Sequence, residues 1–554
     1  MTERPLPPPE GAPVPLPPPS GAPVRGLPPP AGPPVDLPPP PEVARVGVWH
    51  QLNPKMLLVY PVRTAGALAL PFLIAFLGVR GGSPDWALQF GGIFAGLAVL
   101  GGLIPWFTTR YRFTETQLQV RRGLLNRSVV TAPLDRVRSV DLESSLLHRV
   151  LGLAKVKIGT GVDDTRIELD ALGTAEAVEL QRYLLTRSEA VDAPPPGEAL
   201  TGEEVPAPGA APREQVLAEI DWSWLRFAPF SLSSLAIVAA VLGVGSQFVD
   251  EVEIDSEQVQ EAWGWVVAQS IVVLVGALLL AVLVGWVALS TLNYIVQWWN
   301  LRVVRQPGGT LKVTRGLITT RSTTIEEARV RGVRMVEPLL LRLVRGAELS
   351  TLATGVGQGG TTKVLPPSPR EVNQAVGATL LQEDEPLTIR LREHGPASRR
   401  RQLVRAQWTT VSVMVPVLAL TWWLSLPWWV PSGAFAVLVV LSWLLGAETY
   451  RNLGHALTAR YLVAGSGTTQ RERTALERAG IIGWVVRQSF FQRRRGLATL
   501  VATTAAGPEH VEVADLPLET AIALADAATP GLLDQFAGGP PSPPRHHRGG
   551  WGDL

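Results

Sequence analysis

Six long apolar stretches, arranged in three pairs, constrain the fold of this 554-residue chain more than any other feature. A transmembrane helix needs about 20 apolar residues, and each stretch is near that length. Tryptophan lies at the end of several stretches, as is typical of a membrane–water interface. The pairs are residues 64–79 and 86–106, 224–248 and 265–292, and 409–426 and 428–446. We therefore predict six transmembrane helices in three hairpins.

The charges beside these stretches predict their orientation. The short connection within each pair is acidic or nearly uncharged, whereas arginines such as Arg63, Arg110, Arg302 and Arg451 border the other ends. The positive-inside rule therefore places both termini and all long segments on the cytoplasmic side of a cell membrane. No ionisable residue falls deep inside a stretch, which argues against an ion-coupled transporter.

Composition excludes several other classes of protein. The chain has no cysteine, so disulfides, thiolate metal sites and cysteine nucleophiles are excluded. Its 50 basic residues are balanced by 48 acidic ones, unlike the surface of a nucleic-acid binder. Histidines show metal-ligand spacing only in the pair His546 and His547, and no catalytic triad, paired carboxylate or phosphate loop is evident. We predict a protein that is not an enzyme and has no cofactor and no metal site.

A segment with a different pattern follows each pair of apolar stretches. In the first, "RYRFTETQLQVRRGLL" alternates polar and apolar residues in short runs broken by turn residues, which indicates small antiparallel strands. The segment ends in "TAEAVELQRYLLTR", an amphipathic helix that Thr174 can cap. Many strands followed by one helix describe a small β-rich domain.

This β-rich segment occurs three times. Gly123 of the first copy matches Gly316 of the second, and Gly152 matches Gly346. In the third copy "QRRRGLATL" retains a turn and a strand behind its arginines. Ser368 opens the sequence "SPRE", which predicts a capping box with Pro369 as the first helical residue.

The repeat predicts the domain organisation. Residues 1–48 form a proline-rich tail that favours polyproline II, lacks the bulk for a core and can dock in a partner's aromatic groove, so we predict it to be disordered. The predicted domains are hairpin 1 (57–106), β domain 1 (107–187), a linker (188–220), hairpin 2 (224–292), β domain 2 (296–382), a charged linker (383–402), hairpin 3 (408–446), β domain 3 (450–528) and a disordered tail (529–554).

Paired spans followed by a segment such as "RVRSVDLESSLLHRVLGLAKVKI" resemble the bacterial pleckstrin-homology-like (PH-like) domain membrane proteins of the YdbT kind. The resemblance covers roughly residues 49–528. It implies that each β-rich segment is a bacterial version of the PH fold, a bent seven-strand sheet capped by a helix. The expected fold class is thus an α+β membrane protein with a cytoplasmic PH-like domain after each helical hairpin. The family has no established enzymatic activity.

We expect a binding scaffold whose PH-like domains contact anionic lipid headgroups or another membrane protein. A basic residue near an anionic membrane contributes about 1 kcal/mol. The candidate residues are Arg121, Arg122, Arg136, Arg138, Arg315, Arg329, Arg331, Arg334, Arg493, Arg494 and Arg495. The alternative interpretation is that these arginines are solvated residues that only set the topology. Two further functions stay open: a transporter or export component, and a structural protein that defends the cell envelope against membrane-active agents.

Overall fold

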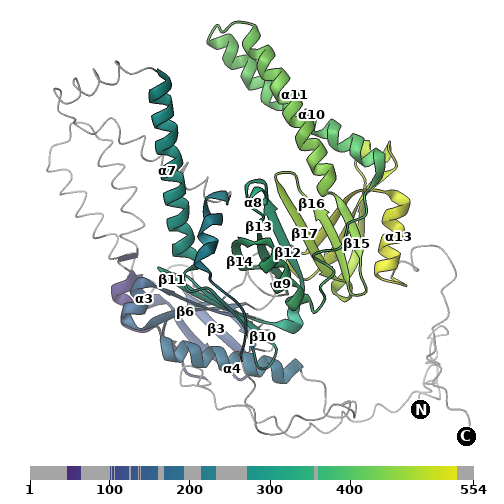
Figure 1. Cartoon of the computed structure of the whole chain (residues 1–554). Helices are drawn as coiled ribbons and strands as arrows, with labels where there is room; N and C mark the ends of the chain where they lie inside the picture. The colour runs from purple at the N-terminus through teal and green to yellow at the C-terminus, as the bar shows by residue number, and fades with distance from the viewer. Residues whose placement is uncertain are drawn as a thin grey trace, which may run out of the picture.

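A computed structural model gives the arrangement of the chain (Figure 1). It describes residues 47–60, 62–63, 96, 100, 103–104, 106–123, 127–134, 137, 139–159, 167–192, 214–231, 271–354 and 360–532. The proline-rich tail, the C-terminal tail from residue 533, most of hairpin 1 and most of the stretch 224–248 lie outside the described residues.

The strands of the first repeat are divided between two antiparallel sheets. β1 (His50–Gln51), β2 (Arg110–Phe113), β3 (Gln117–Arg122) and β4 (Ser128–Pro133) form one sheet in that order. The strands β5 (Ser139–Ser145), β6 (Leu153–Gly159) and β7 (Ile167–Gly173) belong to another, with the short helix α3 (Leu146–Leu151) between β5 and β6. Helix α4 (Thr174–Asp192) ends the repeat and buries Leu180 and Leu184 in its core.

The second and third repeats have the same order of elements. In the second, β9 (Arg302–Gln306), β10 (Thr310–Arg315), β11 (Thr319–Glu326), β12 (Val330–Pro338), β13 (Gly346–Ala353) and β14 (Thr361–Pro369) are accompanied by α8 (Leu339–Leu343) and α9 (Arg370–Leu381). In the third, β15 (Gly454–Leu457), β16 (Tyr461–Ser466), β17 (Gln470–Glu477), β18 (Ile481–Arg487), β19 (Leu497–Thr504) and β20 (His510–Pro517) are accompanied by α12 (Phe490–Arg493) and α13 (Leu518–Ala528).

Neighbouring repeats share their sheets. β5 of the first repeat pairs with β11 of the second in a seven-stranded sheet, and we name this pairing seam 1. β12 of the second repeat pairs with β17 of the third in a six-stranded sheet, which is seam 2. Each repeat therefore covers an open strand edge of its neighbour, where unpaired backbone groups would otherwise remain. The resemblance had implied one separate seven-strand sheet per domain, whereas the strands of each repeat are split between two sheets.

Three of the described helices are long and apolar enough to cross a membrane: α7 (Ile271–Trp298), α10 (Gly395–Trp423) and α11 (Trp429–Asn452). They extend from the same side of the β domains (Figure 1). α10 and α11 pack together, with the Thr410 hydroxyl donating to Ser442 Oγ at 2.7 Å. Ser442 in turn donates to Gln407 Oε1 at 3.1 Å, so these polar groups are satisfied between the helices.

The start of the predicted second hairpin is not a membrane span. Residues Trp222–Phe230 form the 3-10 helix η3, in which Trp224 and Phe227 are buried. Both rings belong to the same hydrophobic core as Trp298, at the end of α7. The Trp224 side chain, predicted to be an interfacial anchor, instead fills the core of the second repeat together with Phe227.

Parts of both predicted linkers are regular secondary structure. Gln215–Glu219, placed in the first linker, is strand β8 and pairs with β9 at the edge of the seam 1 sheet. Gly395–Gln402, placed in the second linker, is the first part of α10. Both segments find backbone partners that composition alone does not reveal.

Two local predictions about helix ends are also wrong. α9 begins at Arg370 with Pro369 as its N-cap, and no side chain caps it, because the Ser368 hydroxyl donates to the carbonyl of Pro366 instead. The residue of the second repeat that is equivalent to Gly152 is Arg345 and not Gly346. Gly152 and Arg345 each follow a short helix and have a positive φ, 69° and 56° respectively. The backbone N–H of Gly152 donates to the carbonyl of Arg149, and that of Arg345 donates to the carbonyl of Arg342.

Candidate membrane-facing site

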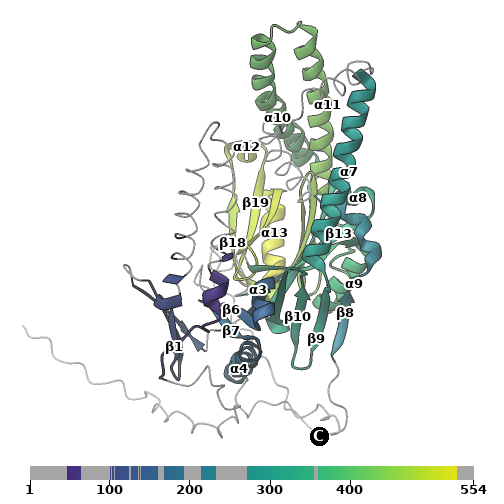
Figure 2. The same ribbon diagram turned by 90° about the vertical axis from the view of Figure 1, so that its left-hand side faces the viewer.

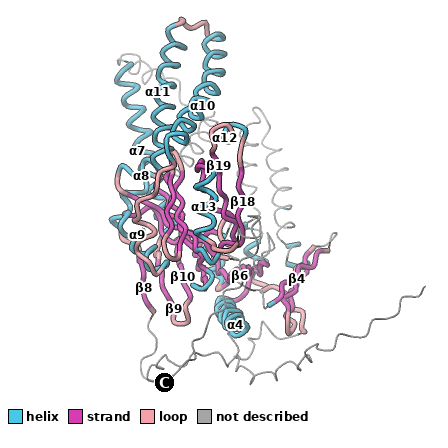
Figure 3. The backbone as a smooth tube through the Cα atoms, turned by 90° about the vertical axis from the view of Figure 1, so that its right-hand side faces the viewer, coloured by secondary structure: helices cyan, strands magenta, loops and turns pink. Residues whose placement is uncertain are grey.

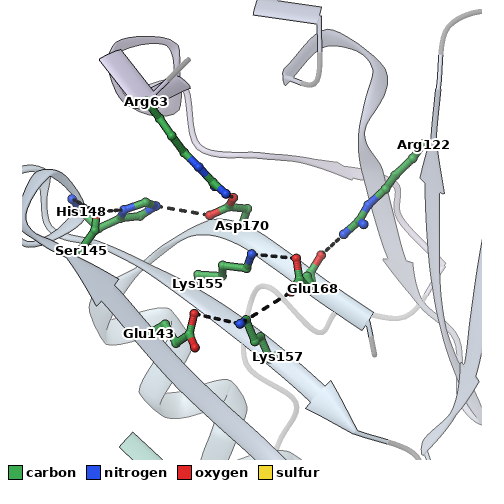
Figure 4. A network of polar contacts seen from close by, with 9 residues as sticks. All are labelled: Arg63, Arg122, Glu143, Ser145, His148, Lys155, Lys157, Glu168 and Asp170. Carbon is green, nitrogen blue, oxygen red and sulfur yellow. Dashed lines mark hydrogen bonds and ion pairs between the residues drawn. The ribbon is translucent and has the colours of Figure 1, made fainter. Parts of the chain in front are cut away.

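The basic residues of the first repeat are largely engaged within a network of opposite charges (Figure 4). Lys155 Nζ lies 2.7 Å from Glu168 Oε2, and Lys157 Nζ lies 2.9 Å from Glu143 Oε2. The candidate Arg122 donates to the main-chain carbonyl of Glu168. Lys155, Lys157 and Arg122 therefore already have acceptors within the protein.

Asp170 lies at the edge of the same network. Its carboxylate lies 3.3 Å from His148 Nε2 and 3.7 Å from Arg63 Nη1. Burial alone would raise the pKa of Asp170, but the His148 hydrogen bond and the nearby cations hold it below its usual range. Arg63, expected at the start of the first span, thus lies beside the first β domain.

Four further candidates are Arg121, Arg136 and Arg138 of the first repeat and Arg315 of the second. Arg136 and Arg138 are outside the described residues. Arg121 is half-buried on β3. Arg315 stacks on Trp298, with its Cζ 4.1 Å from the ring centroid, and burial lowers its pKa to about 10. It therefore stays charged at neutral pH while packing against the end of α7.

Three candidate arginines of the second repeat belong to the structure around seam 2. Arg329 is buried and pairs with Glu326. Arg331 Nη1 reaches across the seam to Glu477 Oε2 at 2.9 Å, and Arg334 Nε donates to Thr474 Oγ1 at 3.3 Å. The contacts of Arg331 and Arg334 join the second and third β domains, whereas that of Arg329 lies within the second.

Arg493, Arg494 and Arg495 differ from the other candidates because all three are exposed. They lie at the end of α12 and just beyond it, next to Phe490 and Phe491, whose side chains are each 65% exposed. Ser489 and Gln492 form a capping box that fixes this short helix. Two exposed aromatic rings beside three arginines form an element suited to a membrane–water interface.

Equivalent short helices in the other repeats have the same character. α3 exposes Leu146, Leu147 and Val150, and α8 exposes Leu339 and Leu343. Arg149 and Arg342 are equivalent to Arg493, because the main-chain carbonyl of each of the three accepts the backbone hydrogen bond that closes its short helix. We name α3, α8 and α12 the interfacial helices. Each carries exposed apolar side chains and one equivalent arginine.

Each interfacial helix is connected to the end of a membrane helix. Arg149 of α3 donates to the carbonyl of Leu317, whose own N–H donates to Val296 of α7. Arg342 of α8 lies 2.7 Å from Glu448 of α11. Figure 2 shows α8 and α12 at the end of the β domains from which the membrane helices extend.

The third connection passes through a buried carboxylate. Asp515, at the end of β20, is fully buried and accepts hydrogen bonds from Arg401 and Gln402 of α10 at 2.5 and 2.6 Å. Gln492 of α12 donates to the same carboxylate at 2.7 Å. A displacement of α12 is therefore coupled to the start of α10.

A charged pocket of about 440 Å³ lies beside α8. Glu337, whose side chain is buried, sits 3.0 Å from Arg370 Nε and 3.5 Å from Arg471 Nη1. Arg342 and Arg345 also line the pocket. Arg345 is exposed and makes no side-chain hydrogen bond or ion pair with the described residues, so an anion can reach its guanidinium.

An aromatic cluster marks the β-domain end of α7. The Trp222 and Trp299 rings meet edge to face at 5.2 Å, and both are exposed. At the opposite end of the other two membrane helices, Trp422, Trp423, Trp428 and Trp429 are exposed around the connection of α10 to α11. Tryptophan at both ends is the distribution that the two interfaces of a bilayer favour.

The interfacial helices were only partly predicted. Arg493–Arg495 were candidates, but Arg149, Arg342 and the exposed apolar residues were not. The sequence did contain a signal, since "LLHRVLG", "LLLRLVRG" and "FFQRRRG" each place apolar residues before a basic one. Among the residues that the structure describes, no cluster of three or more His, Asp or Glu side chains could hold a metal ion.

Membrane-crossing helices joined to repeated β-rich domains, each ended by a helix, define a membrane protein with PH-like domains. The family model for the bacterial PH domain matches residues 66–188, 257–384 and 410–529, so the chain belongs to that family. The three matches confirm the predicted resemblance and agree with the threefold repeat.

A curated relative supports the same assignment. The UPF0699 transmembrane protein YdbT of Bacillus subtilis (strain 168) is 20% identical over 305 residues. The matched region is 53% of this chain and 60% of that protein, so less than two thirds of the relative's length is covered. No solved structure matches the chain.

Proposed function

We propose that the protein is a non-catalytic, membrane-anchored scaffold whose interfacial helices bind the anionic headgroup layer at the cytoplasmic face. One observation carries this proposal: each of the three repeats presents a short helix with exposed apolar side chains and an equivalent arginine. Each of these helices is also bonded, directly or through one residue, to the end of a membrane helix.

The chemistry of α12 suits this role best. Phe490 and Phe491 bury apolar area when they enter the interfacial zone, and each arginine near an anionic surface adds about 1 kcal/mol. Three arginines thus contribute about 3 kcal/mol, or roughly a hundredfold in affinity. The corresponding arginines of α3 and α8 are engaged with protein atoms, so those helices contribute mainly apolar contact.

The proposed topology has six membrane helices in three hairpins, with the β domains and both termini in the cytoplasm. Arginines cluster at the β-domain ends of α7, α10 and α11, where Arg302, Arg399, Arg400, Arg401 and Arg451 lie. The described residues of the α10–α11 connection, 424–428, carry no charge. This asymmetry supports the cytoplasmic placement.

A fluorophore on α12 of the full chain tests the proposal. Because the chain has no cysteine, Phe491→Cys provides a single site for an environment-sensitive dye. In nanodiscs of neutral lipid and of neutral lipid mixed with phosphatidylglycerol, we expect a blue-shifted emission and stronger quenching by brominated lipid in the anionic discs. Added salt should reduce the difference, since it screens exposed charges.

Charge variants decide whether the arginines cause that difference. Arg493→Gln with Arg494→Gln should abolish it. Lys363→Gln with Arg460→Gln is the matched control, because these two exposed cations lie outside the interfacial helices, Lys363 on β14 and Arg460 just before β16. Identical, water-like emission in both kinds of disc would contradict headgroup binding and direct the search to a protein partner.

A further inference from the structure

The two seams are made in the same way. In seam 1 Ser139 of β5 lies opposite Ile325 of β11, and in seam 2 Gly332 of β12 lies opposite Leu476 of β17. Ile325 and Leu476 are equivalent, because they lie opposite the equivalent residues Leu311 and Leu462 of the preceding strand. The same register therefore joins the first repeat to the second and the second to the third.

Among the described residues, one strand of each kind forms no seam. β4 is the equivalent of β11 and β17, and β18 is the equivalent of β5 and β12. Within the described residues β4 pairs only with β3, and β18 pairs only with β19, so each lies at the edge of its sheet (Figure 3). The chain thus ends its series of seams with two complementary open edges.

Both edge strands expose apolar residues. Ile482 of β18 is 65% exposed, and Val485 and Val486 are also exposed, as is Val129 of β4. Natural proteins usually blunt a free edge with charges, prolines or bulges, because unpaired backbone groups recruit other strands. β18 carries a single charge, Arg487, at its last residue.

We propose that β18 of one copy of the chain pairs antiparallel with β4 of a second copy, forming a third seam between molecules. The partner is a second copy because both edges already exist on this chain and follow the pattern of its own seams. The two internal seams hold the first and third repeats on either side of the second, and β4 and β18 of one chain form no ladder with each other.

The register of the intermolecular seam follows from the internal ones. Gly483 is the equivalent of Gly332, since both come directly after a bulge, and Ala132 is the equivalent of Leu476. Placing Gly483 opposite Ala132 brings Val485 opposite Val130 and Val486 opposite Val129. Pairs of β-branched residues directly opposite each other stabilise antiparallel sheets.

The composition of the third seam also fits contact between copies. At seam 2 the Arg331–Glu477 ion pair sits next to Gly332 and Leu476. The equivalent positions in the intermolecular seam are Ile482 and Pro133, which replace an ion pair by an apolar contact. The exposed Ile482 side chain thereby gains an apolar neighbour.

The geometry is compatible with one bilayer. Because α7 of the second repeat and α10 and α11 of the third extend from the same side of the β domains, seam 2 keeps the membrane sides of these two repeats aligned (Figure 1). A third seam of the same kind keeps the next molecule in the same orientation. This contact is heterologous, so repetition gives a ring if it closes and an open chain in the membrane plane if it does not.

Cysteine cross-linking of the full chain in its membrane tests this arrangement. Mild oxidation of a chain with Val130→Cys and Val485→Cys should give a ladder of disulfide-linked oligomers. Separately tagged chains that each carry one of the two substitutions should give only a mixed dimer when co-expressed. Val130→Cys with Val486→Cys is the off-register control, because neighbouring residues of a strand point to opposite faces.

The mass of the full chain in detergent micelles provides the second measurement. The unmodified chain should be oligomeric, Val129→Lys with Val486→Lys should reduce it to a monomer, and Val129→Glu with Val486→Lys should restore the oligomer. The two side chains replaced, those of Val129 and Val486, are both exposed, so the substitutions should not unfold the chain. A monomeric unmodified chain, or cross-links confined within one chain, would overturn the proposal.

Discussion

Asp515 of β20 accepts a hydrogen bond from Arg401 of α10 at 2.5 Å, and its carboxylate is completely buried. The contact joins the third β domain to a membrane helix, and Gln492 brings α12 to the same carboxylate. Removing one partner of a buried charge pair leaves the other charge uncompensated, which costs about 3–5 kcal/mol.

Asp515→Asn should therefore lower the free energy of unfolding by about 3–5 kcal/mol. Asparagine tolerates the positive φ of 57° at this residue, so the effect measures the lost charge and not backbone strain. Thermal unfolding of the full chain in detergent micelles reports the change. Glu512→Gln on the same strand, where the side chain is half-exposed, should change stability little.

The buried pair His394 and His455 predicts a pH dependence. The two rings are joined at 3.0 Å, and burial together with the neighbouring His394 lowers the pKa of His455 from 6.5 to about 4. Between these values the unfolded state binds more protons, so stability should fall as the pH drops from about 6.5 towards 4 and stay level above that range. The slope is about 1 kcal/mol per pH unit.

A pH series of unfolding midpoints checks this slope. His455→Gln should reduce the slope, leaving the part due to His394, whose pKa burial also lowers, whereas the exposed His510→Gln should leave the slope intact. A midpoint that does not move between pH 7 and 4.5 would show that the histidine pair is protonated without cost in the folded state.

Gly316 shows why the repeats keep a glycine after the second strand of each domain. Its φ is 110°, and a Cβ there would lie 2.1 Å from the carbonyl oxygen of Thr319. Gly316→Ala should cost about 3 kcal/mol, because strain and a backbone clash add. Gly309, with a φ of 74° but no atom within 4 Å, should cost only about 1 kcal/mol when changed to alanine. Equal costs in denaturant titrations would refute the clash.

The proposed topology predicts which cysteines are accessible from outside. Leu426→Cys, in the α10–α11 connection, should react with a membrane-impermeant maleimide in intact cells. Lys363→Cys, on β14, should react only after the membrane is permeabilised. The reverse pattern would place the β domains on the outer side.

Local patterns in the sequence predicted the repeats well. The match of Gly123 to Gly316 was correct. Gly467 is the equivalent glycine of the third repeat, because all three have a φ near 100° at the same turn. The match of Gly152 to Gly346 was wrong by one residue because Arg345 adopts the left-handed conformation usually taken by glycine. Aligning the repeats by sequence pairs residues of the same type, whereas the fold requires a left-handed backbone conformation at this position, whichever residue adopts it.

The seams could not be predicted in the same way. Strand alternation indicates that a strand exists but does not identify its neighbour, so the pairing of β5 with β11 and of β12 with β17 had no local signal. For the same reason the sequence did not indicate that the candidates Arg331 and Arg334 contact the third repeat. Among the candidate arginines that the structure describes, only Arg493–Arg495, which follow two exposed aromatic rings, are exposed.

Hydrogen exchange of the full chain in nanodiscs tests headgroup binding by the interfacial helices most directly. The account predicts that the amides of α12 and of Arg494–Gly496 exchange more slowly in discs with phosphatidylglycerol than in neutral discs. The difference should shrink with added salt, while β15–β17 should exchange equally in both. Equal exchange of α12 in the two kinds of disc would contradict the account.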